Sequence, residues 1–500
     1  FEFFPDNLEY GLRLAAVQKS ARSTEEALAT LATLRHLPAP DGNDPRIDMQ
    51  QAEVLEIKGN YKEEHIAAEA AVRRARELGT RLLLAHALTQ DARCLEAQGQ
   101  LDQAIASAQE AAQIADSPGE RTEMARALTV LGLVRYDQGN FPEAVNSHKK
   151  ALAIQREIGN QRGAATSLNN LANALGAQGD LAGSTNLLRE ALGIFKQIGD
   201  KHSAAAVLNN IATRTYRQGQ LKEAKELLDE ALAISREIGD QQRASIAVYN
   251  LGEVLRWQGD LKRARKMDEQ AQELSKQLGD ESGVAYALNS LGEISLAEDD
   301  IASARNQFNQ ALTVRNQIGE RGNAAETQLA LATLQFEENQ SADVQKIVGQ
   351  ARDEFHSEGL REDEILADAL LARVLATQGK ISDSQKEAAS ADALLPRNQD
   401  FSVQLRASIA KAQVDAAAGN RDNALRALDE TITSAGKSGY LGFQLEAELA
   451  SAEIQLASGK ASAAIQRLHE IRAQAQQHGF RLIAAKAMRA PTKSTSTKSR

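Results

Sequence analysis

Asparagine side chains recur at two adjacent slots of a forty-residue repeat, where their amides could contact an extended polypeptide. The two columns are Asn169, Asn209 and Asn289, and Asn170, Asn210 and Asn250. An amide donates and accepts hydrogen bonds, so a row of them can pair with a peptide backbone without reading its sequence. Because Asn is a mediocre helix former, its recurrence in register needs a reason. Bonding between neighbouring helices is the alternative, and the sequence leaves both open.

Aromatic and arginine side chains fall on the same segments as these asparagines. The group is Tyr216, Arg217, Tyr249, Arg256, Trp257 and Tyr286. Tyr, Trp and Arg are the types enriched at binding hot spots. Guanidinium groups suit carboxylates and phosphates, so the predicted partner is a protein or peptide segment, acidic or phosphorylated in character. Packing is the alternative role for Tyr216.

Residues for catalysis or metal binding do not assemble in this sequence. The histidines are scattered without HExxH spacing, and the single Cys94 cannot build a thiolate zinc site. Segment 431–439 ends like a phosphate loop, but it lacks that loop's first glycine and a preceding strand. The carboxylates of Glu226 and Glu230 are expected to face solvent. We therefore expect no catalytic residue, no metal and no cofactor.

Two glycine columns about twenty residues apart divide each repeat into two segments. Gly219 and Gly259 belong to the first column, and Gly239 and Gly279 to the second. Glycine after a helix is a C-cap signal, because it adopts positive φ without a Cβ clash. Between the glycines, apolar residues recur at i, i+3, i+4 and i+7, which predicts helices. Each repeat should therefore form helix A and then helix B, with no strand.

The repeat continues without insertion or deletion from residue 121 to 320, and its frame extends from about residue 41 to about 480. A fixed period of this size indicates an all-α solenoid, in which each unit packs only against its neighbours. We expect near-additive stability along such an array. We also expect one long continuous surface and no enclosed pocket.

The columns resemble the tetratricopeptide repeat. Its Leu-Gly pair, turn glycine and helix B alanines stand at Leu131-Gly132, Gly139, Ala144 and Ala151. The forty-residue form is similar to the repeats of kinesin light chains and of large bacterial signalling regulators. The resemblance implies a right-handed superhelix of about twelve helix-turn-helix units. It also implies that helix A lines a concave groove bearing an asparagine ladder.

The opening residues 1–21 resemble the start of the repeat region in bacterial eukaryotic-like Ser/Thr kinases and winged-helix regulators. That resemblance implies a kinase or DNA-binding part upstream of Phe1. We expect a non-catalytic interaction scaffold, the sensor or docking region of a larger bacterial signalling protein. One alternative is the C-terminal part of a Ser/Thr kinase. Another is the small-ligand-sensing region of a transcriptional activator, which would need a closed pocket.

Composition and repeat quality give the remaining expectations. The net charge of −10 argues against nucleic-acid binding, and the lack of a long apolar run argues against membrane association. A single cysteine fits a reducing, cytoplasmic compartment. The predicted regions are degenerate repeats at 1–80, a well-formed array at 81–320, degenerate repeats with a capping helix at 321–489, and a disordered basic tail at 490–500.

Overall fold

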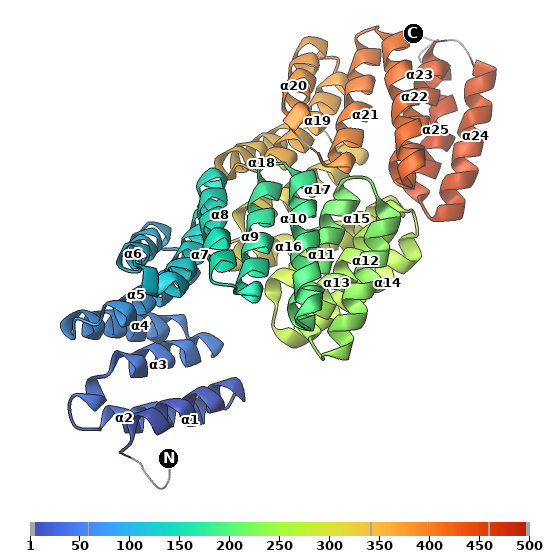
Figure 1. Ribbon diagram of the computed structural model, residues 1–500. Helices are drawn as coiled ribbons and strands as arrows, with labels where there is room; N and C mark the ends of the chain where they lie inside the picture. The colour runs from blue at the N-terminus through green and yellow to red at the C-terminus, as the bar shows by residue number, and fades with distance from the viewer. Residues whose placement is uncertain (1–5, 59, 341–342, 398, 459–460, 497–500) are drawn as a thin grey trace. The chain divides into compact units, whose positions relative to one another are not determined.

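The computed structural model describes residues 6–58, 60–340, 343–397, 399–458 and 461–496, and every regular element in those ranges is helical (Figure 1). The chain divides into two compact units, Phe1–Ile198 and Gly199–Arg500. The predicted all-α solenoid is therefore confirmed.

The first unit contains ten α-helices in consecutive pairs. They are α1 (Leu8–Ser20), α2 (Thr24–Arg35), α3 (Pro45–Ile57), α4 (Tyr61–Glu77), α5 (Arg81–Ala97), α6 (Leu101–Ile114), α7 (Arg121–Asp137), α8 (Phe141–Glu157), α9 (Gln161–Ala177) and α10 (Leu181–Gln197). Short 3₁₀ turns lie at Asp41–Asn43 and Pro118–Glu120. Cys94 on α5 is buried, and its thiol donates to Glu64 at 3.0 Å.

The second unit contains the other fifteen α-helices of the described chain. They are α11 (Lys201–Arg217), α12 (Leu221–Glu237), α13 (Gln241–Trp257), α14 (Leu261–Leu278), α15 (Glu281–Ala297), α16 (Ile301–Ile318), α17 (Arg321–Glu337), α18 (Val344–Glu358), α19 (Arg361–Thr377), α20 (Ile381–Leu394), α21 (Phe401–Ala417), α22 (Arg421–Ser438), α23 (Leu441–Ala457), α24 (Ala461–His478) and α25 (Arg481–Ser496). A 3₁₀ turn lies at Leu395–Arg397.

Most helices of the described chain end at a turn residue with positive φ, as the glycine columns predict, whereas α2, α6 and α20 end without one. Gly219 has φ 83° and Gly259 has φ 82°, and the replacements Asp299 and Asn339 also adopt positive φ. The next helix then begins at a capping side chain. Asp240, for example, accepts a hydrogen bond from the backbone N–H of Arg243 at 3.0 Å. Such a cap satisfies one of the free N–H groups of the first turn.

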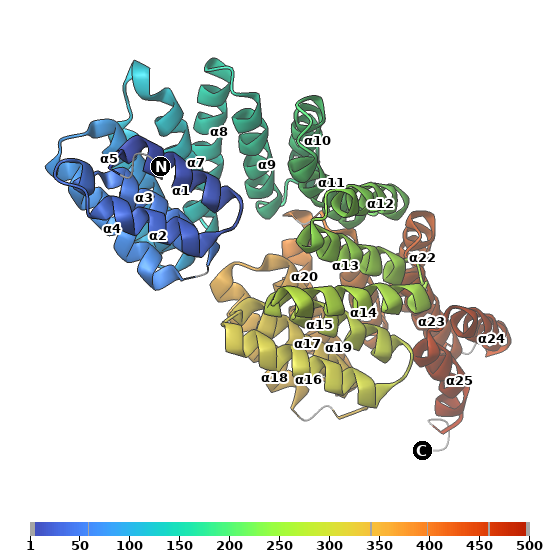
Figure 2. The same cartoon turned by 90° about the horizontal axis from the view of Figure 1, so that it is seen from below.

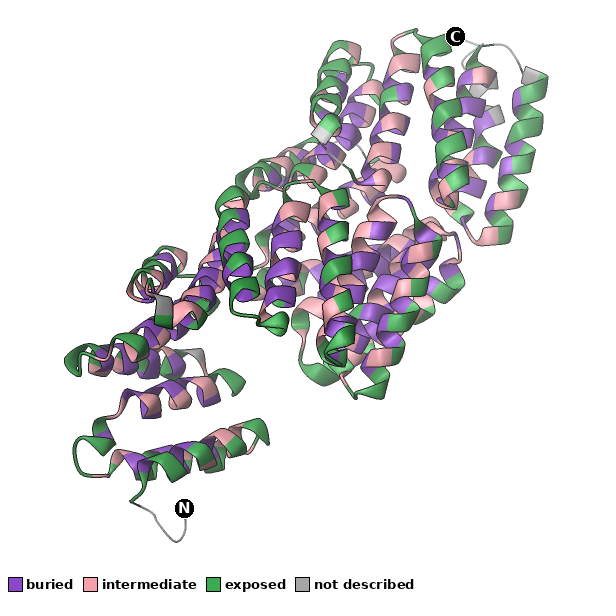
Figure 3. Ribbon diagram, viewed as in Figure 1, coloured by how far each residue is buried: buried purple, intermediate pink, exposed green. Residues whose placement is uncertain are grey.

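Buried side chains form stripes along the helices (Figure 3). Alanines at the closest helix contacts, such as Ala224 and Ala264, are fully buried. The opposite faces carry exposed charge, and Glu226 and Glu230 on α12 are exposed as expected. The predicted tail 490–500 begins inside α25, while residues 1–5 and 497–500 lie outside the described chain.

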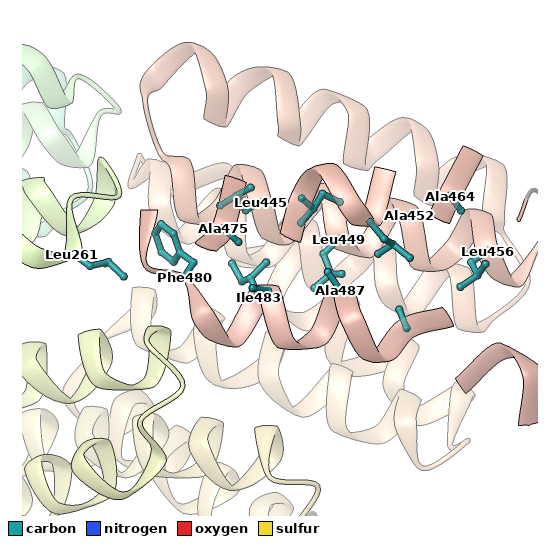
Figure 4. Close-up of a cluster of buried hydrophobic side chains, with 14 of the residues drawn as sticks. Leu261, Leu445, Leu449, Ala452, Leu456, Ala464, Ala475, Phe480, Ile483 and Ala487 are labelled. Atoms are coloured by element: carbon teal, nitrogen blue, oxygen red, sulfur yellow. The ribbon is translucent and has the colours of Figure 1, made fainter. Parts of the chain in front are cut away.

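The second unit departs from a simple solenoid because its last helices pack against its first ones. One core cluster contains Leu255, Leu261 and Ile294 from α13–α15 together with Phe480 and Ile483 from the C-terminal end. Figure 2 shows α23 and α25 beside the green helices α13 and α14, and Figure 4 shows Leu261 facing Phe480. The expectation that each repeat packs only against its neighbours is wrong for this unit.

Candidate functional site

The predicted asparagine ladder lies on the first helix (helix A) of several repeats, in both units. On α9 in the first unit, Asn169 Nδ2 donates to Asn170 Oδ1 at 3.2 Å, and both side chains are half-buried. The two residues are sequence neighbours, so this bond does not link helices. Whether they contact a ligand stays a prediction.

In the second unit the ladder runs over α11, α13 and α15. Asn250 Nδ2 donates to Asn209 Oδ1 at 2.9 Å, which ties α13 to α11. Asn210 is half-buried beside Asn209. Asn289 on α15 is only 6% exposed, yet its Oδ1 has no hydrogen-bond partner in the described chain. The packing role is therefore observed for one pair, while Asn289 keeps an unused acceptor.

Two of the predicted tyrosines lie beside this ladder. The rings of Tyr249 and Tyr286 are tilted against each other with centroids 5.9 Å apart. The guanidinium of Arg315, whose side chain is fully buried, lies 5.0 Å from the centroid of Tyr286. Arg315 also pairs with Glu326 at 3.1 Å. Sequence reasoning missed Arg315 and Glu326 because they lie on α16 and α17, outside the recurring columns.

The other predicted hot-spot aromatics contact the C-terminal helices of their own unit. Trp257 stacks on Phe443 with centroids 5.2 Å apart and lies 5.8 Å from Tyr440. The hydroxyl of Tyr440 donates to the backbone carbonyl of Tyr216. We call the contacts among Tyr216, Trp257, Phe401, Tyr440 and Phe443 the aromatic closure.

Both predicted hot-spot arginines are ion-paired within the chain. Arg217 pairs with Asp400 at 2.7 Å and also with Glu362. Arg256 pairs with Glu253 at 2.8 Å and with Glu293 at 2.6 Å, and it stacks over Trp257. The expectation of an acidic or phosphorylated partner rested on unoccupied guanidinium groups. Each of these groups already has two carboxylate partners, which removes that reason.

A cavity of about 240 Å³ lies inside the second unit, beside the aromatic closure. A second compartment of about 140 Å³ shares several of its walls, including Arg256, Trp257 and Glu326. The apolar walls include Leu329, Phe443 and Ile483. This partly open cavity departs from the expected continuous surface, because the last helices of the unit pack against earlier ones.

The charged residues lining the two compartments are more often acidic than basic. The carboxylates are Glu253, Glu293, Glu326, Glu337, Asp363 and Glu446, and the cations are Arg256, Arg373, Arg406 and Lys486. Most of the acids have partners. Glu337, for example, pairs with Lys486 at 2.5 Å.

Asp363 is a half-buried lining carboxylate that forms no ion pair within the described chain, and Glu446, which forms none there either, is exposed. Asp363 lies in the first turn of α19. Burial and the neighbouring carboxylates of Glu326 and Glu362 raise the pKa of Asp363 to about 8, since each disfavours a further negative charge. At neutral pH this carboxyl is therefore largely protonated.

In the described chain, no group of three or more His, Cys, Asp or Glu side chains could hold a metal ion. None of the helices in those ranges is long and apolar enough to cross a membrane. Segment 431–439 lies within the end of α22 and closes at Gly439 with φ 79°, so it forms a helix terminus.

The paired helices, the turn glycines and the small helix-contact alanines define a tetratricopeptide-repeat protein. A family model described as tetratricopeptide repeat matches residues 123–197 and 163–237. A model described as MalT-like TPR region matches residues 204–486. The chain belongs to this MalT-like TPR family, and the predicted repeat identity is confirmed.

Solved structures show partial similarity at low sequence identity, whereas no curated protein matches the chain. BtubC (BKLC) from P. vanneervenii is 21% identical, with 44% of this chain and 92% of that chain covered and a TM-score of 0.40. A Rap protein complexed with competence and sporulation factor is 17% identical, with 66% and 98% covered and a TM-score of 0.45. Aspartyl phosphate phosphatase F from Bacillus subtilis is 11% identical, with 78% and 94% covered and a TM-score of 0.47.

Proposed function

We propose that the chain is a non-catalytic scaffold that binds a protein or peptide segment along its helices A. The observation that carries this proposal is the amide row of the second unit. Asn209 and Asn250 are linked at 2.9 Å, and Asn289 on the next helix A retains an unused acceptor. Such a row suits backbone recognition, in which affinity depends little on side-chain sequence.

The wider setting of this scaffold is also a proposal. A sensor or docking role in a larger cytoplasmic signalling protein of bacteria would suit an interaction surface of this kind. The alternative is that a Ser/Thr kinase or winged-helix domain precedes this scaffold in the full protein. Sequencing the gene upstream of the codon for Phe1 tests both, since a kinase would show its catalytic-loop motifs.

The proposed binding is tested with a partner captured by the full chain and identified by mass spectrometry. Replacing Asn209 and Asn210 together by Ala should weaken that partner by about 1 kcal/mol for each lost backbone hydrogen bond. The matched control replaces the exposed pair Glu226 and Glu230 by Ala on α12. Unchanged affinity in the asparagine variant, with a loss in the control, would place the site on the opposite face.

A second candidate function is small-ligand sensing, and the cavity beside the aromatic closure is the observation that favours it. Ligand sites are concave and combine apolar walls with polar groups, and this cavity combines apolar walls such as Leu329 and Phe443 with several charged groups. Trp257, the only tryptophan, lines both compartments and reports on their occupancy. A saturable change in its fluorescence during a metabolite screen would support this function, and a silent screen would count against it.

A further inference from the structure

The two compartments of the second unit adjoin each other and make a divided space, because they share lining residues from several helices. Arg256 and Trp257 of α13, Glu293 of α15, Glu326 of α17 and Arg406 of α21 line both. A ligand in this space would therefore meet groups from repeats that are far apart in the sequence. It would also lie against Trp257.

The carboxylates that line the space differ in their ion pairs, and Arg406, a half-buried cation that lines both compartments, forms no ion pair within the described chain. Glu326 is partnered by Arg315, and Glu293 by Arg256. Asp363 has no ion pair within the described residues, although it faces the negative charge of Glu326. A half-buried carboxyl beside another carboxylate attracts a proton or a cation.

The charged groups that act most strongly on Asp363 come from four helices or their caps. Glu326 of α17, Glu362 of α19 and Asp400, which caps α21, disfavour its ionised form. Arg217 of α11 favours the ionised form, but it is already paired with Glu362 and Asp400. Burial adds to the acids, so the pKa of Asp363 lies near 8.

A buried hydrogen-bond acceptor of the smaller compartment has no donor in the described chain. Asn289 is 94% buried, lines the smaller compartment, and has no donor for its Oδ1 in the described chain. A buried acceptor without a partner is unfavourable, and native structures usually satisfy it. A ligand that brings N–H donors would supply the missing hydrogen bond. This observation is independent of the charges.

We propose that the cavity of the second unit binds a small cationic group, an alkylammonium or a guanidinium, on an apolar stem. The cation pairs with Asp363 and Glu326, its N–H groups reach Asn289 Oδ1, and the stem packs against Leu329 and Phe443. This proposal rests on the small-ligand function given above and names the chemical class of the ligand.

The size of the cavity limits the ligand. The two compartments, about 240 Å³ and about 140 Å³, together reach only the lower end of the usual range of roughly 300–1,000 Å³ for sites of drug-sized molecules. A free diamine or an agmatine-like molecule fits that space, and so does one Lys or Arg side chain of a bound segment. Both sources present the same chemistry, and the test below separates them.

The test is calorimetric titration of the full chain, with Trp257 fluorescence recorded in parallel. The probes are cadaverine and agmatine as free cations, and the blocked peptide Gly-Gly-Lys-Gly-Gly as a side-chain source. Pentanol and glutarate are the neutral and anionic controls. We expect saturable binding of cationic probes only. Preference for the free amines assigns a small-molecule ligand, and preference for the peptide assigns a bound segment.

The decisive variant is Asp363→Asn, which keeps the shape of the side chain and removes its charge. We expect it to weaken cation binding at least tenfold at pH 8. The matched control is Glu226→Gln, the same kind of charge removal at an exposed position on α12. It should leave binding unchanged. Asn289→Leu, which removes the acceptor, should weaken binding about threefold or more, the scale of one hydrogen bond.

The number of protons released on binding can be measured, and a purely structural effect of the substitution would not change it. A cation favours the ionised carboxyl, so binding to wild type should tighten as pH rises from about 6 to 9, and it should release a proton. The binding enthalpy should then depend on the ionisation enthalpy of the buffer, and this dependence should vanish in Asp363→Asn.

Several results would overturn the inference. If pentanol or glutarate binds and the cations do not, the cavity takes a ligand of another class, and only the small-ligand function survives. If no probe binds, the cation site does not exist. If Glu226→Gln loses as much affinity as Asp363→Asn, the effect is general charge attraction rather than this site.

Discussion

Trp257 and Phe443 stack face to face, with ring centroids 5.2 Å apart and an interplanar angle of 17°. The two residues belong to α13 and α23, which are separated by nine other helices in the chain. Repeats that pack only against their neighbours would not bring these two residues together. The curvature of the second unit therefore brings its last helices back to its early ones. The same two rings also form part of the cavity wall.

The first prediction concerns cooperativity in the second unit. Deleting residues 440–500 removes the partners of Leu255, Leu261 and Trp257. We expect α13–α15 to lose at least about 2 kcal/mol of stability, the scale of burying one large apolar side chain. Native-state hydrogen exchange should show this as faster exchange in α13–α15.

Deleting residues 1–80 is the control for this truncation, because that segment belongs to the first unit. It should leave exchange in α13–α15 unchanged. If the C-terminal deletion also leaves α13–α15 unaffected, then stability is additive along the array, as in a simple solenoid.

The second prediction uses two turn glycines with nearly the same backbone conformation. Gly259 has φ 82° and Gly379 has φ 74°. A Cβ at Gly259 would lie 2.6 Å from Leu441 Cδ2, whereas a Cβ at Gly379 meets nothing within 4 Å. Both alanine variants carry left-handed strain, but only the first also overpacks the closed ring.

We therefore expect Gly259→Ala to cost about 1–2 kcal/mol more than Gly379→Ala. Urea denaturation of the two variants against wild type measures the difference. Equal losses would mean that backbone strain accounts for both, and that the approach of Leu441 to this turn has no energetic consequence.

The third prediction separates the hydrogen bond of Tyr440 from its packing. The hydroxyl of Tyr440 donates to the carbonyl of Tyr216, which also accepts from the N–H of Gly219 at 2.9 Å. That carbonyl stays satisfied in Tyr440→Phe, so the loss should be about 1 kcal/mol or less. Tyr440→Ala should lose about 3–5 kcal/mol, the usual result of removing a buried aromatic ring.

Thermal unfolding of both Tyr440 variants checks this order. Trp257 emission should shift to longer wavelength in Tyr440→Ala but not in Tyr440→Phe, because only the former exposes the indole to water. Similar stability in the two variants would show that the ring of Tyr440 adds little to the aromatic closure.

Much of this fold could be predicted from the sequence because its signals are local. The turn glycines and the i, i+3, i+4 apolar spacing act within one helix, so a single sequence reveals them. The ring closure depends on rotation accumulated over many repeats, which no single unit encodes. One signal was present in the fortieth column, where Asp240 and Asp280 are followed later by Tyr440 and Phe480. Aromatic residues there mark where the closing helices meet α13 and α14.

The site could be predicted only in part, for the same reason. Asn209, Asn250 and Asn289 stand in register, and their recurrence revealed them. Asp363 and Glu326 occupy no recurring column, and they gain importance only because the curvature of the unit brings them together. An arginine in a recurring slot, such as Arg256, looked available for a ligand, but the closed unit surrounds it with carboxylates.

The last prediction follows from the raised pKa of Asp363. Below about pH 3 this carboxyl is largely protonated in both the folded and the unfolded chain, so it does not oppose folding. As pH rises, the unfolded chain ionises near its ordinary value, whereas the folded chain holds the proton until about pH 8. The folded state therefore binds more protons across this window, and the free energy of unfolding should fall as pH rises through it.

Asp363→Asn removes this loss because the amide does not ionise. We expect the variant to exceed wild type least near pH 4.5, by about 1 kcal/mol, and most at pH 8, by at least about 2 kcal/mol, with most of the gain appearing above pH 5. Urea denaturation at pH 4.5, 6 and 8 measures the difference, with Glu226→Gln as an exposed control that should track wild type. A stability difference that is constant with pH, or one that is largest at pH 4.5, would show that the folded unit leaves the ionisation of Asp363 unperturbed.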